Sequence, residues 1–333
     1  MSTAFLFSHS PFRRMLLLSA TAALCLSALA ASTPAKADDT LKVAVGQRGS
    51  WDTSVSELGQ KAGIFKKHGL DLDLLFTQGA GETQQATISG SVDIGIGGGV
   101  MGVLSAFEKG APIRVIGTEI NSAGDYWYVP TASPIKTIKD ADGATMAYST
   151  NGSSTQAIVL AIIKEHGLTK AKPVATGGPP ATFTQVMSGQ IDVGWATPPF
   201  GIQALEEGKI RILARGNDIK EIREQTNRLL ISSAPVLERR KAAIERYMDA
   251  YRETVAYMYS DPMALKYYSE IASIPESLAK RVRDEFFTKD MLMPDKIIGM
   301  NIIMPAAVSL KYLSAPIPDD KLKVLFQIPP SHQ

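Results

Sequence analysis

The sequence predicts an α/β fold made of two similar lobes. Three short phrases occur twice in the same order, 98 or 99 positions apart, and strand and helix patterns alternate through both stretches. One unit of about 100 residues is therefore present twice, and a ligand is expected in the cleft between the two copies. The paired phrases are residues 64–70 and 162–168, 79–81 and 177–179, and 89–95 and 188–194.

Each copy predicts short strands separated by helices. In residues 70–76 leucine alternates with aspartate, which is typical of a strand, and His68-Gly69 has the pattern that ends a helix. The predicted strands of the first copy are 41–45, 70–76, 92–96 and 113–118, and its helices are 54–67, 82–88 and 100–108. The predicted strands of the second copy are 145–148, 172–175, 193–195 and 210–214, and its helices are 153–166, 183–187 and 201–207.

From Val236 onward the pattern becomes helical. Prolines at 262, 275, 294 and 305 divide this region into several amphipathic helices. The methionine-rich stretch Met291–Met304 is interpreted as core filling rather than as a copper or haem site, because no histidine lies near it.

The N-terminus predicts export. Residues 1–37 contain a basic pair, an apolar stretch and an Ala-Lys-Ala sequence that fits a signal-peptidase site, so we expect cleavage before Asp38. The apolar stretch is too short and too rich in alanine and serine to favour a membrane anchor. Cys25, the only cysteine, lies inside this segment, so the mature chain is expected to have no disulfide, thiolate nucleophile or cysteine metal site.

The net charge of the predicted mature chain argues against a nucleic-acid partner. Removal of residues 1–37 takes away three basic and no acidic residues, which leaves a nearly neutral chain with no basic patch of the kind that binds phosphate backbones. Neither a cofactor nor a metal is expected from the residue pattern.

The ligand site is predicted at the carboxyl ends of the strands, where loops lead into helix N-termini. The loop 150–155 places hydroxyl groups and a glycine at a helix start, where free N–H groups bind anions. Arg48 is the cation expected in a cleft loop of the first copy, and tryptophans gather near the same loops, although core packing explains them equally well. The predicted ligand-binding residues are Arg48, Ser50, Trp51, Gly79, Ala80, Gly81, Glu82, Gly98, Gly99, Trp127, Asn151, Gly152, Ser153, Ser154, Thr155, Gly178, Trp195 and Thr197.

Several phrases resemble a known family. Residues 63–70, 89–95 and 133–140 are similar to phrases of periplasmic solute-binding proteins, in the branch that serves nitrate, sulfonate, taurine and bicarbonate ABC transporters and also contains thiamine-pyrimidine binders. The resemblance implies a type II periplasmic-binding-protein fold, with a mixed sheet flanked by helices in each lobe and a hinge of two crossing strands, near 125–130 and 228–232. It implies a signal peptide at 1–37, a first lobe at 38–127, a second lobe at 128–229 and a return to the first lobe at 230–333.

The same resemblance implies a function. We expect a periplasmic monomer that captures a small anionic solute in the interlobe cleft by hinge closure and delivers it to a permease in the inner membrane. Binding of an aromatic or pyrimidine-type solute, and ligand sensing for a receptor that is not a transporter, remain as alternatives.

The resemblance also extends to enzymes with this fold. The related pyrimidine synthases use cysteine and histidine, whereas His68 and His166 are predicted at the end of the lobe opposite the cleft. Glu82 and Asp93 could act as acid or base, but Glu82 fits a helix N-terminus and Asp93 begins its strand. We therefore do not expect an enzyme.

Overall fold

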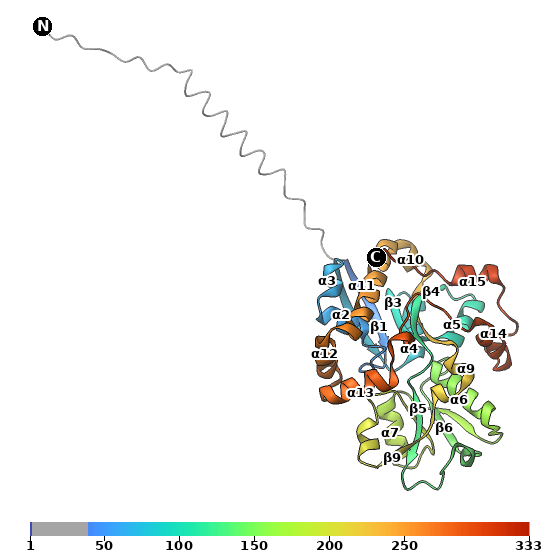
Figure 1. The fold of residues 1–333 in the computed structure, drawn as a ribbon. Helices are drawn as coiled ribbons and strands as arrows, with labels where there is room; N and C mark the ends of the chain where they lie inside the picture. Colours follow the sequence, from blue (N-terminus) through green and yellow to red (C-terminus); the bar gives the residue numbers. More distant parts are fainter. Residues whose placement is uncertain (2–38, 333) are drawn as a thin grey trace. The chain divides into compact units, whose positions relative to one another are not determined.

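The computed structural model describes Met1 and residues 39–332 (Figure 1). The predicted signal peptide and its cleavage site lie, apart from Met1, outside the described residues and stay a prediction. Between residues 39 and 332, no helix has both the length and the apolar character needed to span a membrane.

A five-stranded mixed sheet forms the centre of what we call the first lobe. Its order is β2-β1-β3-β10-β4, with β1 parallel to β2 and β3, and β10 antiparallel to β3 and β4. Strands β3 and β10 are buried along their whole length, as expected for central strands covered on both faces. The strands are β1 (Asp39–Gly46), β2 (Leu70–Thr77), β3 (Ile94–Gly99), β4 (Ile113–Asn121) and β10 (Thr226–Ser233).

The second lobe repeats this order with different strands. Strands β8-β5-β9 form one sheet and β6-β7 another. Val193, directly before β8, connects them, because its N–H donates to the Thr145 carbonyl and its carbonyl accepts from the Ala147 N–H of β6. The combined order β7-β6-β8-β5-β9 matches β2-β1-β3-β10-β4, and β5 is antiparallel to its neighbours as β10 is. The strands are β5 (Tyr126–Pro130), β6 (Thr145–Tyr148), β7 (Lys172–Ala175), β8 (Gly194–Ala196) and β9 (Ile210–Arg215).

Helices connect the strands, and a further set follows β10. Figure 1 shows α2, α3, α10 and α11 around the first sheet and α7 beside β5. The helices of the two alternating stretches are α2 (Val55–Lys61), α3 (Ile64–Lys67), α4 (Ala80–Ile88), α5 (Val100–Glu108), α6 (Ser154–His166), α7 (Pro179–Met187), α8 (Ile202–Glu206) and α9 (Lys220–Arg223). Those after β10 are α10 (Ala234–Arg239), α11 (Lys241–Ser260), α12 (Pro262–Ala272), α13 (Glu276–Phe286), α14 (Met300–Ser309) and α15 (Asp319–Leu325).

The chain changes sheets twice. It passes from β4 to β5 within residues 122–125, and it returns between β9 and β10, within residues 216–225. These changeovers lie a few residues from the predicted lobe boundaries, because β5 belongs entirely to the second sheet and β10 entirely to the first. The division into lobes stays a proposal, with the changeovers moved to these residues.

Two local predictions were wrong. The helix expected at 54–67 is split into α2 and α3, because Gly63 adopts a left-handed backbone with φ of 76°. The strand expected to end at Ile96 continues through Gly98 and Gly99, because both pair with β10 after a register shift. Backbone pairing on both sides thus overrides the local tendency of a glycine run to form a loop.

The core contains the large aromatic side chains. Trp51, Trp127 and Trp195 are fully buried, and Tyr247 of α11 packs on Phe65 of α3 with ring centroids 5.3 Å apart. Buried aromatic surface of this size contributes much of the stability of a domain.

The core consists of a main cluster and a second hydrophobic cluster around α5 and α14. The methionine-rich stretch ends in this second cluster. Met304 is buried there with Ile303 and Ala307, and its sulfur accepts a hydrogen bond from the Ile317 N–H. Met291 is buried in the main cluster. Both residues fill the core, as predicted. Among residues 39–332, no group of histidine, cysteine and acidic side chains is arranged to hold a metal ion.

Candidate functional site

A small cavity lies where the two lobes meet. It is lined by the carboxyl ends of β1 and β3, by the start of α4 and by the loop that leads into α6, which is where the strand-end rule predicted it. Its volume is about 10 Å³, enough for roughly one water molecule. The lining residues are Gly46, Gln47, Thr53, Ala80, Gly97, Ser149, Ser153, Ser154 and Arg228.

The second lobe contributes the N-terminus of α6. Ser153 caps this helix and accepts a hydrogen bond from the Gln156 N–H at 3.2 Å. The Thr155 hydroxyl accepts from the Ser149 N–H at 2.9 Å, and the Gln156 side chain accepts from the Gly152 N–H at 2.7 Å. These contacts hold a set of buried hydroxyl groups at the end of a helix whose dipole is positive there.

The lobes touch closely around this helix start. The Gly81 N–H donates to the Thr150 hydroxyl at 3.2 Å. A Cβ placed on Gly102 would lie 2.3 Å from the carbonyl oxygen of Gly152, and one on Gly99 would lie 2.6 Å from the same oxygen. Only residues without a side chain permit this approach of α5 to the loop before α6.

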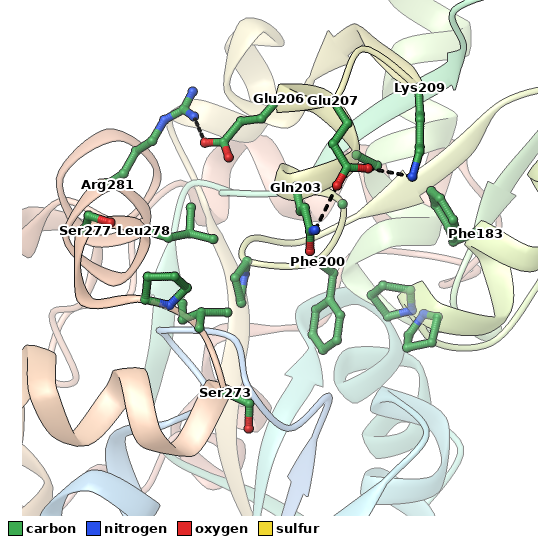
Figure 2. Close-up of a pocket in the computed structure, with 17 residues that line it drawn as sticks. Phe183, Phe200, Gln203, Glu206, Glu207, Lys209, Ser273, Ser277, Leu278 and Arg281 are labelled. Carbon is green, nitrogen blue, oxygen red and sulfur yellow. Dashed lines mark hydrogen bonds and ion pairs between the residues drawn. The ribbon is translucent and has the colours of Figure 1, made fainter.

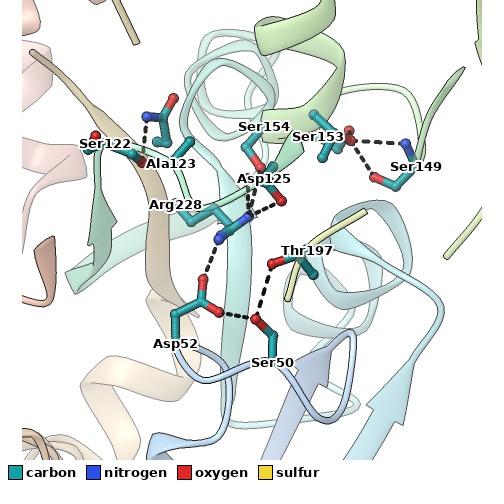
Figure 3. A network of polar contacts seen from close by, with 12 residues as sticks. Ser50, Asp52, Ser122, Ala123, Asp125, Ser149, Ser153, Ser154, Thr197 and Arg228 are labelled. Carbon is teal, nitrogen blue, oxygen red and sulfur yellow. Dashed lines mark hydrogen bonds and ion pairs between the residues drawn. The ribbon is translucent and has the colours of Figure 1, made fainter. Parts of the chain in front are cut away.

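Arg228 of β10 lies at the centre of the contact between the two lobes, which we call the seam. Its guanidinium bonds to Asp52, to Asp125 at 3.2 Å and to the Ser154 hydroxyl at 3.5 Å, so it joins both lobes and the first changeover segment (Figure 3). Its Nε lies 3.2 Å from Glu119 Oε1 of β4. Arg228 and the three carboxyl groups around it are all buried.

This burial changes the proton affinity of the cluster. Burial raises the pKa of Glu119 to about 8, although the charge of Arg228 opposes the change. Burial also raises the pKa of Asp125, again against the pull of Arg228. For Arg228 burial alone would lower the pKa, but the charges of Asp52, Asp125 and Glu119 outweigh it and raise the pKa.

A second polar link crosses the seam. The Ser50 hydroxyl donates to Asp52 at 2.5 Å and lies 3.2 Å from the Thr197 hydroxyl of the second lobe (Figure 3). Ser50 and Thr197, both predicted for the site, are therefore in contact with one another and, through Asp52, with Arg228.

Arg48 lies away from the small cavity. It pairs with Glu57 of α2 at 2.5 Å, and its guanidinium lies 4.4 Å from the centroid of the Phe76 ring. Half of its side chain is exposed. The cation that does line the small cavity is Arg228, which sequence reasoning placed in a crossing strand without giving it a role. An arginine directly before the apolar run Leu229–Ile231 is the signal that could have identified it.

The predicted tryptophans are core residues in this conformation. Trp51 donates to the Tyr259 hydroxyl at 3.0 Å, and Trp127 donates to the Ala147 carbonyl at 2.9 Å. Trp195 is fully buried, and its Nε1 has no hydrogen-bond partner among the described residues. None of the three lines the small cavity.

The remaining predicted residues lie along the seam or beside it. Ala80, Ser153 and Ser154 line the small cavity, and a Cβ on Gly178 would lie 3.8 Å from the Gln78 carbonyl of the other lobe. Glu82 is directed back to its own loop, where it accepts from the Gln78 N–H at 2.9 Å. The others in these segments are Gly79, Gly81, Gly98, Gly99, Asn151, Gly152 and Thr155.

A larger open cavity of about 970 Å³ lies between α7 and α8 of the second lobe and the α12–α13 corner (Figure 2). Prolines, Phe183, Phe200 and Leu278 form much of its wall. Arg281 of α13 and Glu206 of α8 form an ion pair across it at 2.8 Å. Both partners are well exposed, so this ion pair contributes little to stability.

Comparison with known proteins gives a consistent result. A family model described as NMT1/THI5 like matches residues 57–264. A curated relative, the putative aliphatic sulfonates-binding protein of Escherichia coli (strain K12), is 28% identical over 172 residues, which are 50% of this chain and 51% of the relative. The chain thus matches about half the length of that relative.

Solved structures share the fold. The alkanesulfonate-binding protein from Xanthomonas axonopodis pv. citri, solved with bound MOPS, superposes with a TM-score of 0.67 over 82% of this chain and 92% of its own, at 16% identity. A desulfurization enzyme superposes with a TM-score of 0.59 over 85% and 95%, at 15% identity. At these identities the superpositions show the fold alone, and binding proteins and an enzyme both use it.

Proposed function

The chain belongs to the NMT1/THI5-like family, and on that premise we propose that it is the periplasmic solute-binding component of an ABC importer. The curated relative is named as a binder of aliphatic sulfonates, and the alkanesulfonate-binding protein has the same fold. The permease of the importer is the expected partner. The export signal predicted at residues 1–37 agrees with this location.

One observation supports binding between the lobes above all others. The small cavity combines strand ends of the first lobe with the α6 N-terminus of the second, and its volume of about 10 Å³ is far below that of an organic solute. A solute can enter only if the lobes separate, and it can be enclosed only if they close again. We therefore include hinge closure in the proposal.

The anionic group of the solute is proposed to bind at Asn151–Thr155, opposite Gly79–Glu82. Helix α6 has 13 residues, and its first turn provides N–H groups and hydroxyls where its dipole favours negative charge. The aromatic-solute alternative has less support, because Trp51, Trp127 and Trp195 are engaged in the core. Arg48 has no part in the proposal, since Glu57 neutralises it.

The enzyme alternative lacks a reacting group in the small cavity. Among the described residues that line it, the hydroxyls of Thr53, Ser149 and Ser153 have no histidine beside them to act as a base. His68 lies elsewhere and bonds to Glu253 of α11 at 2.8 Å. Capture and delivery of a solute therefore fits the site better than chemistry on it.

Ligand capture is tested first without assuming the solute. Native mass spectrometry of protein purified without refolding identifies a retained small molecule, and a thermal-shift screen of alkanesulfonates, nitrate and carboxylates covers a weaker binder. A solute at a hundred times its Kd should add roughly 2.7 kcal/mol to stability. Absence of both a retained molecule and any shift would reject a solute-binding role.

The position of the anionic group is tested at Ser153. Ser153→Ala removes a hydroxyl worth about 1.5–3 kcal/mol when it meets a charged group. By calorimetry the affinity should fall roughly tenfold to a hundredfold, and Ser153→Asp should weaken binding further through charge repulsion. Ser188→Ala, at an exposed serine of the same lobe, is the matched control and should bind like wild type. Unchanged affinity in Ser153→Asp would place the anionic group elsewhere.

A further inference from the structure

One side chain of α6 holds the turn that precedes this helix. The Gln156 Oε1 accepts from the Gly152 N–H at 2.7 Å, and its Nε2 donates to the Asn151 Oδ1 at 3.4 Å. Its backbone N–H donates to the Ser153 hydroxyl at 3.2 Å. Reciprocal contacts of this kind stabilise the first turn of a helix. The conformation of the turn at residues 151–153 therefore depends on where the Gln156 side chain lies.

The position of that side chain is set from the first lobe. The Tyr312 hydroxyl donates to the Gln156 Oε1 at 2.6 Å. Tyr312 follows α14, and its own N–H donates to the Ala307 carbonyl at 2.8 Å. The next residue, Leu313, is buried in the second hydrophobic cluster with residues of β4 and β10. Burial raises the pKa of Tyr312, so its hydroxyl stays a donor at neutral pH. The donor thus belongs to the first lobe and the acceptor to the second.

The turn borders two cavities. Ser153 lines the small cavity, whereas Asn151, Gly152 and Gln156 line an open cavity of about 660 Å³ beside α4 and α5. Tyr312 lines the open cavity as well. Among the described residues around this open cavity, the bond between Tyr312 and Gln156 is the one hydrogen bond that joins the lobes. The side of the turn that faces away from the small cavity is therefore supported from the first lobe by Tyr312.

We propose that Tyr312 is a positioning residue for solute binding: its hydrogen bond fixes Gln156, and through Gln156 the turn at residues 151–153, while the lobes are closed. When the lobes separate, the Tyr312 hydroxyl leaves with the first lobe, the turn loses this support, and the solute is released. Tyr312 acts through Gln156 and does not itself contact the solute. The inference rests on the function proposed above and concerns the regulation of that same site.

The first test measures binding kinetics with Tyr312→Phe, which keeps the ring and removes the hydroxyl. The probe is the solute found by the mass-spectrometric and thermal-shift screens. Its dissociation should be about threefold to tenfold faster than from wild type, the value of one hydrogen bond. Association should be unchanged, because the bond forms only after the lobes close. Tyr257→Phe, at a partly buried tyrosine of α11, is the matched control and should dissociate like wild type. Equal dissociation from Tyr312→Phe and wild type overturns the inference and leaves the solute-binding function intact.

The second test observes the turn directly. With solute bound, hydrogen exchange of the Gly152 amide should be severalfold faster in Tyr312→Phe than in wild type. The Ile231 amide, in the centre of β10, reports the stability of the whole fold and should be accelerated less. Equal acceleration of both amides would mean that the hydroxyl merely stabilises the fold, and it would overturn the positioning role.

A disulfide makes the second test independent of any solute. The Ser50 and Thr197 hydroxyls lie 3.2 Å apart across the seam, so Ser50→Cys with Thr197→Cys is designed to hold the lobes closed on oxidation. The exported chain should contain no other cysteine, because Cys25 lies in the predicted signal peptide. Oxidation should protect the Gly152 amide, and Tyr312→Phe should remove most of that protection. Full protection in the oxidised Tyr312→Phe protein overturns the inference. Loss of protection in a protein that binds no solute supports the coupling and rejects the solute-binding function alone.

Discussion

The two lobes use the same internal contacts but contribute different chemistry to the seam. In the first lobe the Thr77 and Thr83 hydroxyls lie 2.7 Å apart, and in the second the Thr176 and Thr182 hydroxyls lie 2.6 Å apart. In each pair the second threonine also donates to a glycine carbonyl at the start of its helix.

The aspartates of the repeated phrases match in the same way. Asp93 accepts from the Lys42 N–H at 2.9 Å, and Asp192 accepts from the Thr145 N–H at 2.7 Å. Asp93 thus ties the turn before β3 to β1, and Asp192 ties the turn before β8 to β6. The repeated residues therefore build the scaffold.

The difference lies at the strand ends that meet. The first lobe contributes Asp52, Glu119 and Arg228, which are ionisable groups, whereas the second contributes neutral hydroxyls and a helix N-terminus. Repeated residues such as these threonines and aspartates thus maintain the fold, whereas the polar groups at the seam differ between the lobes. A sequence repeat predicts the first and says little about the second.

The largest effect is expected where the two lobes touch, because a side chain added there should prevent them from closing. In Gly102→Ala a Cβ would lie 2.3 Å from the Gly152 carbonyl oxygen, although alanine suits helix α5. The variant should fold and stay open, so calorimetry should detect no binding of a solute that wild type binds, and small-angle scattering should show a larger radius of gyration that the solute does not reduce. Gly178→Ala, with its nearest contact across the seam at 3.8 Å, should close normally. Closure of Gly102→Ala as in wild type would contradict the hinge proposal.

The pH dependence of stability tests the ionisable groups that the first lobe contributes to the seam. Glu119 has a pKa of about 8 in the folded protein and an ordinary value near 4.5 when unfolded. Between these values the folded state binds a proton that the unfolded chain has released, so stability is lost as the pH rises from 4.5 to 8. Glu119→Gln should avoid a loss on the order of 3–5 kcal/mol. Urea unfolding of both proteins at pH 5 and pH 8.5 measures the difference. A constant difference between the two proteins would mean that Glu119 is ionised in the fold.

The twin aspartates should differ in their effect. Asp93 is buried and also contacts Arg240 at 3.5 Å, whereas Asp192 is exposed. Asp93→Ala removes a more deeply buried acceptor and should cost about 1–3 kcal/mol, against roughly 0.5–1 kcal/mol for Asp192→Ala. Denaturant titration of the pair tests this order, and the reverse order would mean that burial is not the deciding factor.

The threonine pairs should show the smallest difference. Thr83 and Thr182 are both fully buried with matching partners. Replacing either by the isosteric valine should cost about 1–2 kcal/mol, and the two values should agree within about 0.5 kcal/mol. Thermal unfolding of the two single variants provides the comparison. A gap much larger than this would show that the repeated contacts are not equivalent.

The sequence allowed the two lobes, most of their elements and the loops of the seam to be predicted, because repeats, caps and strand ends are local patterns. It did not reveal the cluster of Asp52, Glu119, Asp125 and Arg228, since these residues lie far apart in the sequence. They meet only because β10 inserts between β3 and β4, and local patterns do not predict such a pairing. The sequence also did not show that Arg48 would lie away from the small cavity. Its partner Glu57 is on the next helix, and the geometry of the loop decides whether the two meet.

The insertion of β10 also has a consequence for biogenesis. All strands of the second lobe lie between residues 126 and 215, so that lobe is complete as soon as this stretch is available. The first lobe must wait for Thr226–Ser233, because β3 and β4 contact each other only through that strand. A chain that emerges N-terminus first therefore holds an unfinished sheet with two open edges while its later half folds. Such edges favour aggregation and recognition by chaperones, so the early part of this polypeptide is the part that needs protection longest.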